Sequence, residues 1–133
     1  MEEEPKKKIA DATLQEALDE IKRLKLLKKK KDMDIADLKQ YKNKIKSEKS
    51  NLNDTKTKRL RTLQESINKT ATKSAKDSKR NSRETEKKSF ESKIRRKEKE
   101  IETVDGKILA IESDKKQIDF YIEAFNQHIK TLK

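Results

Sequence analysis

The side chains that commonly catalyse reactions or bind metals are scarce in this sequence. His128 is the only histidine and cysteine is absent, which excludes a disulfide framework, a thiolate zinc site and a cysteine nucleophile. Because His128 has no second histidine or cysteine as a partner, it is expected to be a solvent-facing helix residue. The acid pairs Asp32/Asp34 and Glu100/Glu102 look like ordinary helix charges. The sequence therefore predicts a protein that is not an enzyme, with no cofactor, metal ion or small-molecule substrate.

Lysine and arginine carry the strongest chemical signal, because they outnumber the acids by 37 to 25 and give a net charge of +12. The excess lies between residues 20 and 99 and includes four consecutive lysines. A basic stretch of this kind attracts polyanions, such as phosphates or the acidic surface of a protein. The residues expected to contact such a partner are Lys28, Lys29, Lys30, Lys31, Lys42, Lys49, Lys79, Arg80, Arg83, Arg95 and Arg96.

Helices are the elements that must position these cations. Only 29% of the residues are hydrophobic, too few for a globular core, and one glycine and one proline are too few breaks for many short elements. Such a composition is typical of disorder, but the apolar residues recur at alternating spacings of three and four. That period predicts amphipathic coiled-coil helices.

Two segments carry the apolar pattern. Residues 1–10 are expected to be frayed, with Asp11 or Thr13 as helix N-cap, and residues 11–67 form a basic coiled-coil helix whose phase slips after Leu52. Residues 68–89 are a polar connector or a solvated helix, and residues 90–133 form the stronger heptad coiled coil, in which Gly106 is a tolerated weak spot. The predicted seam residues are Leu14, Ile21, Leu24, Ile35, Leu38, Ile45, Leu52, Ile94, Ile101, Val104, Ile108, Ile111, Ile118, Ile122, Phe125, Ile129 and Leu132.

Two all-α architectures without a globular core fit this pattern. One is a long, nearly continuous coiled-coil helix, and the other is a two-helix antiparallel hairpin that bends near residues 76–82 and brings Ile35 to face Phe125. In either case the seam must pack against itself, a second copy or another protein, so homo- or hetero-oligomers are expected. Lys28 and Lys31 would repel their own copies in a parallel homodimer, which favours an acidic neighbour. No apolar run is long enough to span a membrane, and no secretory signal is recognisable, so an intracellular protein is expected.

These features lead to three hypotheses of function. The first is a non-enzymatic coiled-coil structural or adaptor subunit whose basic region contacts an acidic partner, in a cytoplasmic or cytoskeletal setting such as the tubulin surface of a microtubule, cilium or axoneme. The second is a nucleic-acid-associated or ribonucleoprotein component, in the nucleus for example, that binds phosphates through lysine and arginine. Tyr41, the only aromatic residue between positions 20 and 89, leaves little for base stacking. The third is a helical-hairpin stalk, chaperone or secretion-apparatus component.

Overall fold

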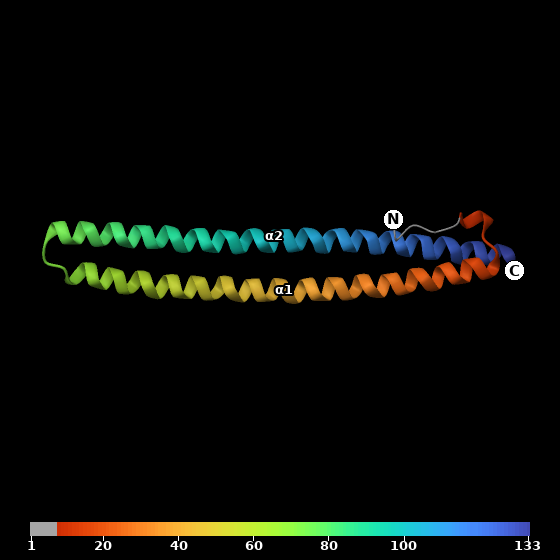
Figure 1. Cartoon of the computed structure of the whole chain (residues 1–133), viewed down its shortest axis with the longest axis horizontal. Coiled ribbons are helices and arrows are strands. Elements are labelled where there is room, and N and C mark those ends of the chain that lie inside the picture. The colour runs from red at the N-terminus through yellow and green to blue at the C-terminus, as the bar shows by residue number, and fades with distance from the viewer. Residues whose placement is uncertain (1–7) are drawn as a thin grey trace. The chain divides into compact units, whose positions relative to one another are not determined.

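The chain folds as an all-α antiparallel hairpin. The computed structural model describes residues 8–133, in which a short 3-10 helix, η1 (Ile9–Asp11), precedes two long helices, α1 (Leu14–Lys69) and α2 (Lys73–Leu132) (Figure 1). The two long helices pack against each other, and the described residues contain no strand. The predicted fold class is thus confirmed, and of the two architectures the hairpin is the one that forms.

Threonine side chains mark where both long helices begin. At the start of α1, the Thr13 hydroxyl accepts a hydrogen bond from the Glu16 backbone N–H, and the Glu16 carboxylate accepts one from the Thr13 N–H, each at 3.2 Å. This reciprocal pair is a capping box. At the start of α2, the Thr72 hydroxyl accepts from the Ala75 N–H at 3.3 Å.

The turn between α1 and α2 is confined to residues 70–72. The bend predicted near residues 76–82 is therefore wrong, because Thr72 caps a helix that runs through that segment in spite of its low apolar content. Of the predicted 68–89 connector, residues 68–69 belong to α1 and residues 73–89 belong to α2. Only residues 70–72 lie outside a helix.

By internal contacts the chain divides into two compact units. We call Met1–Gln40 with Asp105–Lys133 the terminal unit, and Tyr41–Val104 the turn unit. Each unit is built from one segment of α1 and one of α2, and the turn unit contains the 70–72 connection. Each therefore forms its own stretch of antiparallel helix pair.

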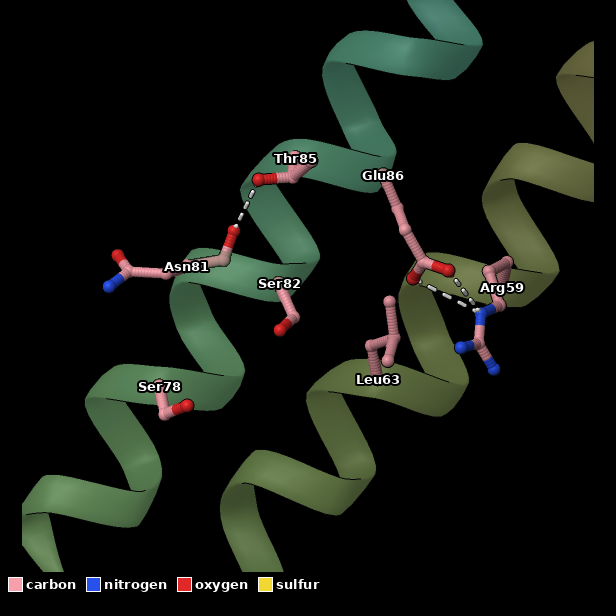
Figure 2. A pocket seen from close by; sticks show the side chains of 7 residues that line it. All are labelled: Arg59, Leu63, Ser78, Asn81, Ser82, Thr85 and Glu86. Carbon is pink, nitrogen blue, oxygen red and sulfur yellow. Dashed lines mark hydrogen bonds and ion pairs between the residues drawn. The ribbon is translucent and has the colours of Figure 1, made fainter.

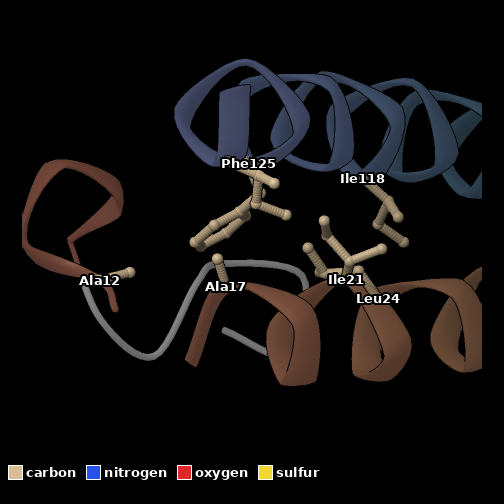
Figure 3. Close-up of a cluster of buried hydrophobic side chains, with 7 residues drawn as sticks. Ala12, Ala17, Ile21, Leu24, Ile118 and Phe125 are labelled. Carbon is tan, nitrogen blue, oxygen red and sulfur yellow. The ribbon is translucent and has the colours of Figure 1, made fainter. Parts of the chain in front are cut away.

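The core of the terminal unit is a cluster around Phe125, whose side chain is fully buried. Figure 3 shows the Phe125 ring directed from α2 toward Ala17 on α1, with Ile21, Leu24 and Ile118 beside it. A large ring fits between two closely packed helices where the facing residue is small. The alanine at position 17 thus makes room for Phe125.

The segment before α1 is held to the same core. Ala12 is buried in the cluster, and Nε2 of His128 lies 2.8 Å from the Ala12 carbonyl oxygen, which can accept a hydrogen bond from the ring N–H. His128 is half-buried, so the prediction of a solvent-facing histidine is wrong. Its ring ties the end of α2 to the η1 segment.

Most predicted seam residues do lie between the two helices. The buried ones are Ile21, Leu24, Ile35, Ile45, Ile94, Val104, Ile108, Ile118, Phe125 and Ile129. Leu38, Leu52, Ile101, Ile111 and Ile122 are half-buried. Leu14 and Leu132, at the outer ends of the helices, are exposed. After the phase slip, Leu60 and Ile67 are buried and α1 continues without a break.

The register of the hairpin differs from the predicted one. Lys28 pairs with Asp119 in the terminal unit and Lys49 with Glu98 in the turn unit, so the residue numbers of each pair add to 147. A bend at residue 80 would have made such sums close to 160. The predicted pairing of Ile35 with Phe125 is therefore wrong by about two heptads, because the turn lies closer to the N-terminus than expected.

No helix in the described part of the chain combines the length and the apolar content that crossing a bilayer requires.

Replacing Phe125 by Ala is expected to lower the free energy of unfolding by about 3–5 kcal/mol, because a fully buried ring leaves a cavity between two helices. Urea denaturation followed by circular dichroism in dilute solution measures this. Phe120→Ala is the matched control: its ring is 67% exposed, and its removal should cost about 0.5 kcal/mol or less. Equal losses in the two variants would contradict the position of the core.

Gly106 lies inside α2, and a Cβ atom at this position would meet nothing within 4 Å. Gly106→Ala is therefore expected to raise the free energy of unfolding by about 0.5–1 kcal/mol, because alanine loses less backbone entropy in a helix. The same urea titration measures the gain. A destabilised variant would argue against a continuous helix through residue 106.

Candidate functional site

Cationic residues inside the seam of the terminal unit pair with carboxylates of the opposite helix. Lys28 Nζ lies 2.7 Å from Asp119 Oδ1, and Lys31 Nζ lies 3.7 Å from Asp114 Oδ2. In the other direction, Lys115 of α2 forms an ion pair with Asp32 of α1. Lys31 thus pairs with the sequence neighbour of Lys115, and Lys115 pairs with the sequence neighbour of Lys31. The two lysines therefore lie opposite each other across the seam.

The turn unit repeats this arrangement. Lys49 Nζ lies 3.1 Å from Glu98 Oε1, and Lys97 Nζ lies 2.6 Å from Glu48 Oε2. Here too two lysines, Lys49 and Lys97, lie opposite each other across the seam, and each pairs with a carboxylate of the other helix. Nearer to the turn, Lys56 pairs with Glu91 at 3.5 Å and Arg59 pairs with Glu86 at 3.2 Å.

These pairs change the proton affinity of their members. The hydrogen bond from Lys97 holds the pKa of the Glu48 carboxyl below its usual value, and the same bond raises the pKa of Lys97. The hydrogen bond to Asp32 likewise raises the pKa of Lys115. The charged forms of these groups are therefore favoured by the fold.

The carboxylates that meet the seam lysines were expected on a partner, and for Lys28, Lys31 and Lys49 they come from the same chain. The reason is the antiparallel fold, which lays the acids of α2 along the edges of the α1 seam. Lys29 and Lys30 point away from the seam and are exposed, and Lys42 is half-buried.

Three predicted contact residues close to the turn also have partners within the turn unit. Lys79 Nζ donates to the Ser66 hydroxyl at 3.0 Å and to the Thr70 hydroxyl at 2.9 Å, and Arg83 Nε donates to the Leu60 carbonyl at 3.4 Å. Arg80 pairs with Asp77 on its own helix at 3.3 Å. Lys79 therefore helps to hold the turn and Arg83 links the two helices, whereas the Arg80 pair lies within α2.

Arg95 and Arg96 are exposed on α2, and Arg95 lines a surface groove together with Lys56 and Glu91. The contact residues predicted from the sequence therefore separate into two groups. One group stabilises the hairpin, and the other faces solvent.

A further groove of the turn unit lies next to the Arg59–Glu86 pair. Figure 2 shows Glu86 extending from α2 to Arg59 on α1, with Leu63 beside them and Ser78 and Ser82 along α2. The Arg59 Nε donates to both Glu86 carboxylate oxygens at 3.2 Å. This groove is polar except for Leu63, and its charged members already satisfy each other.

The two units differ strongly in charge. The turn unit contains 21 Lys and Arg residues against 10 Asp and Glu residues, which gives it +11 of the chain's net +12. The terminal unit holds the remaining 16 basic and 15 acidic residues and is close to neutral. The net positive charge therefore belongs almost entirely to the turn unit.

The acids that neutralise the seam were not singled out by the sequence analysis, although Asp32 was noted as an ordinary helix charge. A signal for them exists in an internal similarity at an offset of 66 residues. "KDMDI" at residues 31–35 resembles "KEKEI" at 97–101, and "SEKSNL" at 47–52 resembles "SDKKQI" at 113–118. In every copy an acid stands next to a seam lysine. The repeat of this acid–lysine pair on both helices could have predicted the crossed ion pairs.

Comparison of this chain with protein-family models, with curated proteins and with solved structures gives no match. Within residues 8–133 no group of three or more histidine, cysteine, aspartate or glutamate side chains could hold a metal ion. The candidate site is accordingly defined by charge and helix geometry.

Exchanging the charges of one crossed pair tests these contacts. Glu48→Lys and Lys97→Glu are each expected to lower the melting temperature, because each places like charges side by side at the edge of the seam. The double variant, in which the attraction is restored with reversed polarity, should regain most of the loss. Melting followed by circular dichroism at low and high salt measures the effect.

Glu102→Lys and Lys99→Glu serve as matched controls for that exchange, because both residues are exposed on α2. They should change the melting temperature little. A double variant no more stable than the two single changes combined would show that Glu48 and Lys97 do not interact.

Proposed function

We propose that this chain is a non-catalytic structural or adaptor subunit, a helical hairpin whose turn unit binds an acidic partner through lysine and arginine. The observation that carries the proposal is the concentration of a net +11 in the turn unit. A dense charge of one sign raises the local concentration of an oppositely charged surface and speeds its association.

The net charge of the turn unit already counts its acids, and half of these are paired with bases of the same unit. Five of its ten acids form ion pairs with bases of the same unit, namely Glu48, Asp77, Glu86, Glu91 and Glu98. Basic side chains such as Arg95, Arg96 and Lys99 remain exposed on α2. These are the residues proposed to contact the partner.

An acidic protein surface fits the turn unit better than a nucleic acid does. Tyr41 and Phe90 are its only aromatic residues, so it has little to stack on bases. Glu84, Glu100 and Glu102 are exposed among the basic residues. They would repel a continuous phosphate backbone, whereas a protein interface accommodates charges of both signs. The favoured partner is therefore an acidic cytoskeletal polymer such as tubulin, in a cytoplasmic, cytoskeletal or ciliary setting.

The hairpin fold supports a second candidate, the stalk, chaperone or secretion-apparatus component. A two-helix hairpin closed by a three-residue turn needs no second chain to fill its seam, as a stalk component requires. In that role the exposed bases of the turn unit would be dispensable for activity. The two candidates thus differ in whether those bases are required.

Cosedimentation with microtubules tests the leading proposal. The chain is expected to bind microtubules of intact tubulin. Binding should weaken when the acidic tubulin tails are removed and when salt is added, and it should persist after nuclease treatment. Changing Arg95, Arg96 and Lys99 together to Gln should weaken binding roughly tenfold, through the loss of three exposed charge contacts.

The control for that variant changes Lys39, Lys107 and Lys130 to Gln. These exposed lysines lie in the terminal unit, and the variant has the same net charge as the first. Its affinity should equal that of the natural chain. Binding to duplex DNA or RNA in place of microtubules would support the nucleic-acid hypothesis, and binding to neither would refute a polyanion partner.

A further inference from the structure

The outer face of α1 in the terminal unit combines leucine and methionine with lysine. At about 100° per residue, six residues fall within an arc of about 100° on the side of the helix turned away from α2. This basic outer face consists of Leu18, Lys22, Lys25, Leu26, Lys29 and Met33. Leu26 is 59% and Met33 is 67% exposed. A surface groove runs between Leu18, Lys22, Lys25 and Leu26.

The outer face of α2 in the same unit has a complementary composition. Five residues fall within an arc of about 80°, also turned away from the seam. This acidic outer face consists of Leu109, Glu112, Lys116, Phe120 and Glu123. Leu109 is 66% exposed, and the exposed Phe120 ring lies edge-on to Tyr121 with 5.7 Å between ring centres. A leucine and a phenylalanine left this open on one face of a helix are typical of an interaction surface.

We propose that the terminal units of two copies of this chain associate, with the basic outer face of one copy packed on the acidic outer face of the other. The lysines of the first face then meet Glu112 and Glu123 of the second, and Leu26 and Leu18 cover Phe120 and Leu109. The two faces extend over 16 and 15 residues, so their first and last Cα atoms are about 21–22 Å apart along the helix. Their lengths therefore match, and their net charges, +3 for Lys22, Lys25 and Lys29 and −1 for Glu112, Lys116 and Glu123, are opposite in sign.

Because each copy carries both faces, two copies can make this contact twice and close a dimer. Two basic outer faces would repel each other, so the contact pairs unlike faces. The surface involved lies in the terminal unit and is distinct from the basic turn unit. The inference therefore stands or falls separately from the proposed partner binding.

Analytical ultracentrifugation of the purified full chain over a wide concentration range tests the proposal. The natural chain should shift from monomer to dimer as its concentration rises. One variant reverses the basic face with Lys22→Glu, Lys25→Glu and Lys29→Glu, and another reverses the acidic face with Glu112→Lys and Glu123→Lys. Each variant alone should raise the dimer dissociation constant roughly tenfold or more.

The decisive measurement is an equimolar mixture of the two variants. A reversed basic face fits a reversed acidic face, and the two unaltered faces still fit each other, so the mixture should recover the dimer. The control Lys44→Glu, Lys46→Glu and Lys58→Glu makes the same charge change at exposed positions of the turn unit and should dimerise like the natural chain.

Circular dichroism establishes that every variant remains helical, as expected for changes on outer faces. A second variant, Leu109→Ser with Phe120→Ser, removes the apolar half of the contact without a charge change and should also weaken the dimer. The proposal is overturned if the natural chain stays monomeric at all concentrations, if neither charge variant weakens its dimer, or if the mixture fails to recover it.

Discussion

Cross-helix pairing of lysine with carboxylate fixes how the two helices of this hairpin fit together. A lysine in an apolar seam is costly unless its ammonium group reaches an opposite charge at the edge. In the terminal unit, Lys115 meets Asp32 of α1. A slip of one heptad in either direction would place Lys39 or Lys25 opposite Lys115 instead. The apolar residues permit several registers, and the charges single out one.

The all-helical fold and most of its seam could be predicted, because they depend on spacing along one helix. The 3-4 pattern identified residues such as Ile45, Ile118 and Phe125, all of which are buried. Leu14 and Leu132 obey the same pattern and are nevertheless exposed, because they lie at the open end of the helix pair. Periodicity predicts which way a side chain points, and only the length of the partner helix decides whether something covers it.

The turn and the partners of the seam lysines could not be predicted in the same way. A turn of three residues without glycine or proline leaves little local signal, and Thr72 differs from its neighbours only in acting as a cap. The register follows from the position of the turn, so an error there moved every cross-helix contact. The exposed bases Arg95 and Arg96 were predicted as contact residues on charge alone, and their partner remains a proposal. The charge difference between the two units also depends on which parts of the chain the hairpin brings together.

The hairpin brings together residues at very different sequence separations, and this determines the order in which it can form. Near the turn, Arg83 bonds to the Leu60 carbonyl across 23 residues, whereas His128 meets the Ala12 carbonyl across 116. Closing a long loop costs more chain entropy than closing a short one. The two helices are therefore expected to pair first in the turn unit and then progressively toward the chain ends. The contact of His128 is expected to form last. During synthesis, α1 has no partner until α2 follows it, so the contact of His128 with Ala12 can form only after residue 128 has been made.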